Sequence, residues 1–183
     1  MIEFDPVASI VVAATGEPGS RLFMVQARGE GEVVTLIVEK FQIIELAREA
    51  FALLSEIGFP REEPAPPAEE FDEDHDPSWR TGRISFAYEE PRDQVVLEFR
   101  EILPAEEVPG EEVEDPEQLL GDTARFWLSR SQFAELGRQG LEVASQGRPV
   151  CPYCWQPMEP DGEHFCVASN GHGRGVDLTG DEG

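Results

Sequence analysis

The last fifth of the chain concentrates the residue types that bind soft metal ions. All three cysteines and two of the three histidines lie in the 22 residues from Cys151 to His172. Cys151, Cys154, His164 and Cys166 follow the spacing C-x2-C-x9-H-x-C. Structural zinc takes four sulfur and nitrogen ligands in a tetrahedron, and this set supplies them. We therefore predict a structural zinc ion bound by these four residues.

Two short pieces of chain would bring the ligands together. A C-x2-C bend places two thiolates one metal's width apart, and His164 and Cys166 project from the same face of a strand. The sequence "PDGE" at 160–163 supplies the turn between the two pairs. The expected structure is a small zinc-ribbon or knuckle-like hairpin over residues 148–172, followed by a disordered tail over 173–183.

Four alternatives stay open for this segment. His172 could replace His164, which would leave the site closed. If only three of the five candidates bound, zinc would keep an open position of the kind used in catalysis. Cys151 and Cys154 could instead form a dithiol redox pair, or the cysteines could bind nothing.

The charge of the chain argues against several partners. There are 38 acidic and 14 basic residues, which gives a formal net charge of −24. Such a surface repels phosphate backbones and anionic lipids, so we expect neither nucleic acid nor membrane as a partner. The chain shows no spanning apolar run of roughly 18 residues and no secretory signal. Together with an odd cysteine count, this predicts a cytoplasmic protein.

The sequence also predicts the elements of an α+β fold. Residues 9–15, 21–28 and 32–39 have the pattern of strands, the last two as a hairpin across "GEG", and a helix follows over 39–58. Residues 83–90 and 94–102 predict a second hairpin across "PRD". A further strand over 124–130 leads into a second helix, which a capping box of Ser129 and Gln132 starts near Arg130.

The order of elements indicates an internal repeat. Residues 36–50 match residues 126–140 at one offset of ninety, including Gln42 with Gln132 and Leu46 with Leu136. We predict two β-β-β-α halves, which reflect either a true duplication or the chance similarity of amphipathic helices. The predicted organisation is an α+β domain over 1–147, with halves 1–59 and 80–147 and an acidic linker over 60–79.

That linker is rich in proline and acid, so its composition predicts a flexible segment or long loop. His75 lies inside it among carboxylates. A cation site is conceivable there, but we expect a solvated run of charge.

The whole pattern resembles a family of bacterial proteins known as DUF3090, a domain of unknown function. The segments "MIEFDPV", "GEPGSRLFMVQA", "VEKFQIIELA" and the cysteine-rich tail carry the resemblance. It implies Cys151, Cys154, His164 and Cys166 as metal ligands, and favours His164 over His172. It implies no activity. Trp155 stands after the second cysteine, where a glycine would ease a left-handed turn.

For function, the supply of catalytic groups is short. Two histidines sit in the metal segment, the third in the linker, and Lys40 is the one lysine. We therefore expect a non-enzymatic acidic module for protein interaction or regulation, stabilised by structural zinc. The alternative is a zinc-dependent or carboxylate-based enzyme.

Overall fold

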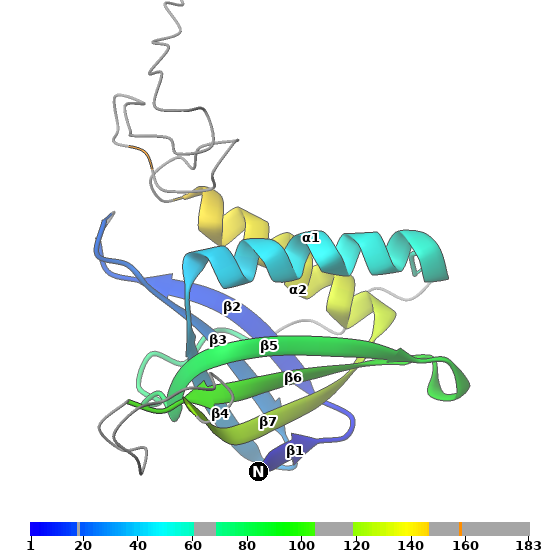
Figure 1. The fold of residues 1–183 in the computed structure, drawn as a ribbon, viewed down its shortest axis with the longest axis horizontal. Helices are drawn as coiled ribbons and strands as arrows, with labels where there is room; N and C mark the ends of the chain where they lie inside the picture. The colour runs from blue at the N-terminus through cyan, green and yellow to red at the C-terminus, as the bar shows by residue number, and fades with distance from the viewer. Residues whose placement is uncertain (18, 61–68, 105–118, 147–157, 159–183) are drawn as a thin grey trace, which may run out of the picture.

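The computed structural model describes residues 1–17, 19–60, 69–104, 119–146 and 158. These residues form a mixed α+β fold, as predicted, in which seven strands make one sheet and two helices, α1 and α2, lie over it (Figure 1). The predicted zinc hairpin and the tail after it lie outside the described residues, apart from Met158.

The elements follow the chain in two consecutive β-β-β-α units. The first unit, preceded by the short strand β1 (Ile2–Phe4), comprises β2 (Ser9–Thr15), β3 (Leu22–Gly29), β4 (Glu32–Val38) and α1 (Lys40–Ile57). The second comprises β5 (Trp79–Glu89), the 3₁₀ turn η1 (Glu90–Arg92), β6 (Gln94–Ile102), β7 (Leu120–Ser129) and α2 (Arg130–Ser145).

Both predicted hairpins are confirmed, and local chemistry explains their turns. β3 and β4 are antiparallel, and Glu30 and Gly31 between them both have positive φ, of 54° and 83°. Two left-handed residues match the twist of a two-residue hairpin, which is why glycine is favoured there. β5 and β6 are antiparallel around η1, which ends at Asp93 in the left-handed conformation.

The strands lie in the order β1-β7-β6-β5-β4-β3-β2. Pairing is parallel between β1 and β7 and between β4 and β5, and antiparallel elsewhere. The short strand β1 was not predicted, because three residues carry too little alternation to identify a strand.

One chain segment joins the two ends of this sheet. Between β1 and β2, the Val7 amide donates to the Trp127 carbonyl on β7 at 2.9 Å, and the Ala8 amide donates to the Arg28 carbonyl on β3 at 2.8 Å. β1 and β2 are therefore consecutive parts of one path that bridges β7 and β3.

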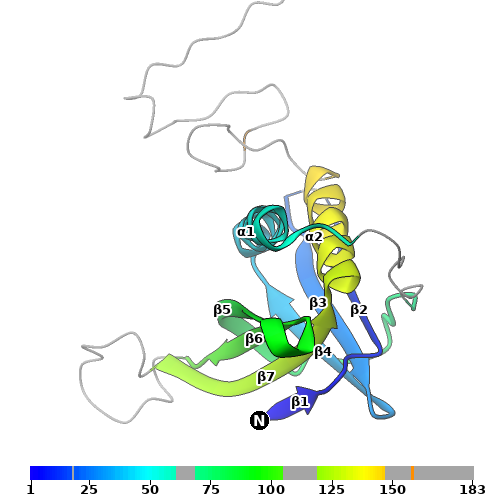
Figure 2. The same cartoon turned by 90° about the vertical axis from the view of Figure 1, so that its right-hand side faces the viewer.

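The core lies between the sheet and the helices. Alternate residues of the strands point inward, and Val25, Leu36, Leu97 and Phe126 are each 0 % exposed. The two helices lie beside each other on the same side of the sheet (Figure 2). A Cβ added at Gly140 of α2 would meet Ile43 Cγ2 of α1 at 2.9 Å, so the small residue permits this close approach.

Both units have a capping box at the start of their helix. Gln42 and Gln132 each occupy the third helical position of a capping box, ninety residues apart. Gln42 Nε2 also donates to the Thr81 carbonyl at 3.3 Å, and Gln132 Nε2 donates to the Val7 carbonyl at 3.1 Å. Each glutamine thus binds the chain at the start of the opposite unit.

Candidate functional site

The predicted metal ligands Cys151, Cys154, His164 and Cys166, with the spare His172, lie outside the described residues. Zinc binding by these residues stays a prediction. Within residues 1–17, 19–60, 69–104, 119–146 and 158, no group of three or more His, Cys, Asp or Glu side chains is arranged to hold a metal ion.

The described residues contain a buried polar cluster on the outer face of the first unit. Gln26 on β3 and Thr35 on β4 lie opposite each other in register and are 1 % and 0 % exposed. Gln26 Nε2 donates to Thr35 Oγ1 at 2.9 Å. Two polar side chains on the face that points away from the helices need a cover, because unpaired buried amides are costly.

Residues 69–78, which we call the strap, provide that cover. Gln26 Nε2 also donates to the Asp72 carbonyl at 3.1 Å, and the Asp72 amide donates to Gln26 Oε1 at 3.0 Å. One amide side chain thereby pairs with the backbone of the strap as a neighbouring strand would. Composition alone suggested a flexible stretch here, but the strap has defined partners on β3.

The N-terminal end of the strap is fixed as well. The Glu69 amide donates to Ser9 Oγ on β2 at 3.0 Å, and Arg28 Nε lies 3.3 Å from the Glu69 carboxylate. Arg28 Nη2 donates to the Glu70 carbonyl at 3.3 Å and to Gln26 Oε1 at 3.0 Å. The strap therefore contacts all three strands of the first unit.

His75 joins this cluster rather than a solvated run of charge. Its Nδ1 lies 3.2 Å from Thr35 Oγ1. Because that oxygen already accepts from Gln26, its own hydrogen is available to donate to an unprotonated Nδ1. A hydroxyl beside an imidazole is the pairing of a nucleophile with its base, but Thr35 is 0 % exposed, so a substrate has no access to it.

A second polar cluster joins the two units at the end of α1. Arg130, the first residue of α2, donates from Nη1 to the carbonyls of Ile57 and Gly58, each at 3.0 Å. Its guanidinium also pairs with Asp93, which accepts from Tyr88 Oη at 2.6 Å. The hydrogen bonds from Arg130 and then from Tyr88 lower the pKa of Asp93.

The charge at Arg130 explains this arrangement. The last carbonyls of a helix lack helical partners and carry partial negative charge, so a guanidinium there satisfies both the hydrogen bonding and the dipole. The cluster is structural: it ties α1, α2 and the β5–β6 hairpin together.

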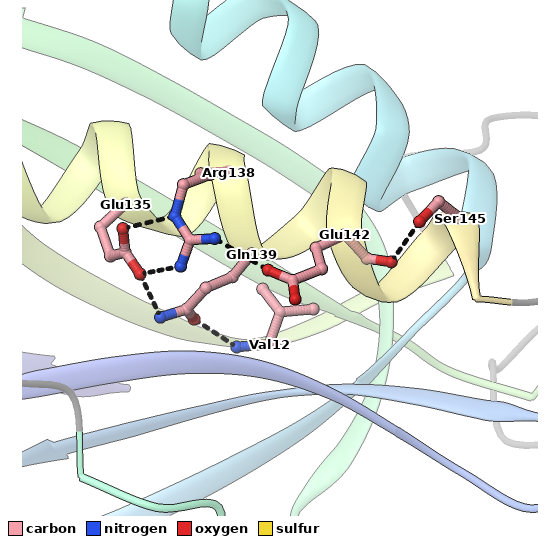
Figure 3. Close-up of polar contacts among 6 residues, drawn as sticks. All are labelled: Val12, Glu135, Arg138, Gln139, Glu142 and Ser145. Carbon is pink, nitrogen blue, oxygen red and sulfur yellow. Dashed lines mark hydrogen bonds and ion pairs between the residues drawn. The ribbon is translucent and has the colours of Figure 1, made fainter.

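The third cluster lies on α2 and reaches β2. Figure 3 shows Arg138 between Glu135 and Glu142, at 2.6 Å and 2.8 Å, while Gln139 Nε2 donates to Glu135 at 3.0 Å. The Arg138 hydrogen bond, as the largest cause, lowers the pKa of Glu135. Gln139 Oε1 accepts from the Val12 amide at 3.3 Å, so this network satisfies one backbone amide at the outer edge of β2.

Sequence reasoning did not identify these clusters. One available signal was that Gln26 and Thr35 are polar residues inside the apolar strand runs "LFMVQAR" and "EVVTLIV". A buried polar residue needs a partner, and the strap supplies it. The identity of that partner depends on tertiary contacts between residues 46 positions apart, which local patterns do not encode.

These features define the class of the molecule: an α+β protein built from two β-β-β-α units on a single sheet. The described helices α1 and α2 do not combine the length and hydropathy that crossing a membrane requires.

The family model described as "Protein of unknown function (DUF3090)" matches residues 2–166, and the chain belongs to that family. No curated protein and no solved structure has a significant match to the chain.

Proposed function

We propose that this protein is a non-enzymatic acidic module for protein interaction or regulation, which acts in the cytoplasm and binds a basic protein partner. The observation that carries the proposal is that arginine side chains are paired with carboxylates of the same chain. Several arginines of the described residues pair with carboxylates of the same chain, among them Arg28, Arg80, Arg92, Arg125, Arg130 and Arg138. The chain has 38 acidic and 14 basic residues, and this excess of negative charge favours a partner of opposite charge.

One exposed acidic stripe is well placed for such a partner. Glu45, Glu49 and Glu56 lie on the solvent side of α1, and all three are exposed. They share one rigid helix face, so a partner can meet them without ordering a loop. Because the helix is already folded before the partner binds, binding costs little conformational entropy.

The experiment is affinity purification of the full chain from its native cells with quantitative mass spectrometry. The matched pair is wild type against Glu45→Arg/Glu49→Arg. We expect a basic protein in near-stoichiometric yield with wild type and a loss of at least about tenfold with the variant, lessened at high salt. Recovery of no protein above a tag-only control would contradict the proposal.

We further propose that the C-terminal segment folds around one structural zinc ion bound by Cys151, Cys154, His164 and Cys166. The ligand spacing supports this, and so does the small size of the segment, which leaves metal binding as its main source of folding energy. The test is zinc content per chain after purification under reducing conditions. Cys154→Ala and His164→Ala should lose the metal, whereas the control His172→Ala should keep it.

The two units also support an origin by duplication of one β-β-β-α element. The support is the offset of ninety residues shared by the two helix starts and by the two glutamines that cross to the opposite unit.

A further inference from the structure

The first strands of the two units, β2 and β5, differ in how closely a helix packs against them. In the first unit, α2 packs along β2, and Gln139 accepts from the Val12 amide at its edge. Ile10 and Val12 on that strand are 5 % and 8 % exposed. In the second unit, far fewer residues of α1 approach β5, and the inward residues Ile84 and Phe86 are only half-buried. Among the described residues, β5 therefore has less helix cover than its counterpart, and the Phe86 ring packs against Phe133 of α2 with the ring centroids 5.2 Å apart.

In the described parts of the chain, β5 also has an open edge over most of its length. On one side of β5, β4 pairs only with its first two residues, Trp79 and Arg80. On the other side, β6 pairs with β5 as far as Glu89. Within the part of the chain that the structure describes, the backbone of residues 84–88 is hydrogen-bonded toward β6 alone. Figure 1 shows β5 as a long strand at the near side of the sheet, next to α1. An edge of this kind is a template for another strand.

The sequence along this edge is complementary to itself. Residues 83–89 read Arg-Ile-Ser-Phe-Ala-Tyr-Glu, with opposite charges at the two ends and Phe86 at the centre. Arg83, Ser85, Ala87 and Glu89 are exposed, and the residues between them are half-buried, so the charged ends share the outer face.

We propose that two copies of this chain associate by antiparallel pairing of their β5 edges, centred on Phe86. In this register Arg83 of each copy lies opposite Glu89 of the other, and the two Phe86 rings face each other on the inner side. Opposite charges and aromatic pairs directly across two strands are the pairs that stabilise antiparallel sheets. The interface is isologous, so it closes as a dimer and does not extend into a fibre.

Other registers lack this match. A shift of one residue would place inward side chains of one copy beside outward side chains of the other. A shift of two residues moves Glu89 of one copy away from Arg83 of the other. Neither charge then faces an opposite charge across the interface. A second copy is thus a better occupant than a foreign acidic or basic strand, which could satisfy only one of the two charges.

The test uses the full chain and a charge exchange. Sedimentation equilibrium over a wide range of concentration should show a monomer–dimer equilibrium for wild type. Arg83→Glu and Glu89→Arg each create two like-charge pairs per dimer, and we expect each to raise the dimer dissociation constant by about tenfold or more. The double variant Arg83→Glu/Glu89→Arg restores opposite charges and should return the constant to near the wild-type value.

Two controls make the result specific. Arg83 also interacts within its own chain, so recovery in the double variant, rather than loss in a single one, is decisive. Glu32→Arg makes the same charge change as Glu89→Arg at an exposed hairpin position remote from β5, and should leave the equilibrium unchanged. Circular dichroism and thermal unfolding identify any variant that fails to fold.

Three outcomes would overturn the proposal. The first is a wild-type monomer of 20.3 kDa at every concentration. The second is a dimer that both single variants leave intact, which would place the interface elsewhere. The third is a double variant that folds but stays monomeric, as expected if β5 instead receives a strand from a different protein.

Discussion

The side chain of Gln26 uses every hydrogen-bonding position of its amide inside the protein. Its nitrogen donates to Thr35 and to the Asp72 carbonyl, and its oxygen accepts from the Asp72 amide and from Arg28. An amide offers two donors and two acceptor lone pairs, so the group is fully satisfied. This residue thereby helps to hold, together with Ser9, Arg28 and Thr35, a ten-residue strap whose composition alone would not order it.

We expect Gln26→Ala to destabilise the protein by about 1–3 kcal/mol, because the buried partners of the amide lose their hydrogen bonds. Urea unfolding measures the change, and hydrogen exchange should show faster exchange of the Asp72 amide. Glu32→Ala, at an exposed position of the β3–β4 hairpin, is the control and should stay within about 0.5 kcal/mol of wild type. Equal stability of Gln26→Ala and wild type would show that the hydrogen bonds of this amide do not contribute to stability.

Asp93 gives the protein an acid-sensitive contact. Because the hydrogen bonds from Arg130 and Tyr88 lower the pKa of Asp93 below its ordinary value of 3.8, the folded state binds this proton less readily than the unfolded state. The contribution to stability is therefore complete above the ordinary pKa and is lost as the pH falls through the lowered one.

We predict that Asp93→Asn flattens the acid limb of the stability profile. Urea unfolding between about pH 7 and about pH 3 should show a smaller loss of stability toward acid in the variant than in wild type. Asp76→Asn, at an exposed position of the strap, is the control. Parallel profiles for wild type and Asp93→Asn would count against the role assigned to this carboxylate.

At the scale of elements, the sequence predicted most of what the structure contains. Both hairpins, both helices and the start of α2 at Arg130 follow from alternation, turn residues and caps, which are local signals. The strap contacts and β1 could not be predicted, because each depends on partners far along the chain: Ile2 pairs with Ala124. The predicted metal ligands stay a prediction, since they lie outside the described residues.

The helix starts give a prediction for the two units together. Gln42→Ala and Gln132→Ala should each cost about 1 kcal/mol or more, since each removes one half of a capping box and a bond to the opposite unit. The loss at Gln132, which is 9 % exposed, should be the larger. Thermal unfolding of the two variants and of the double variant measures this. A negligible loss of stability for either variant would contradict an equivalent role of the two glutamines.

The contact between the helices gives a second prediction. Gly140→Ala would place a Cβ 2.9 Å from Ile43 Cγ2, whereas Gly137→Ala would place one 3.4 Å from Phe51 Cζ. Alanine favours a helix over glycine by about 1 kcal/mol, but overpacking costs about 1–3 kcal/mol. We expect Gly140→Ala to be the less stable of the two by at least about 1 kcal/mol. Chemical denaturation decides the order, and the reverse order would contradict the packing.

At the scale of the whole molecule, the proposed zinc site predicts two separable folding units. Removal of zinc by a chelator should expose residues 148–172 to protease, because metal binding is their main folding energy. The residues before 147 bury their own core, so their unfolding transition should stay cooperative and nearly unchanged. Loss of both in one transition on chelation would show that the segment is integral to the core.

The path that joins both ends of the sheet also bears on synthesis. β1 leaves the ribosome before its pairing partner on β7, because Ile2 pairs with Ala124 and more than a hundred residues separate the two strands in the chain. During that interval the opening residues have no strand beside them. The pairing of β1 therefore awaits the synthesis of β7, and a chain cut short before β7 cannot complete the sheet.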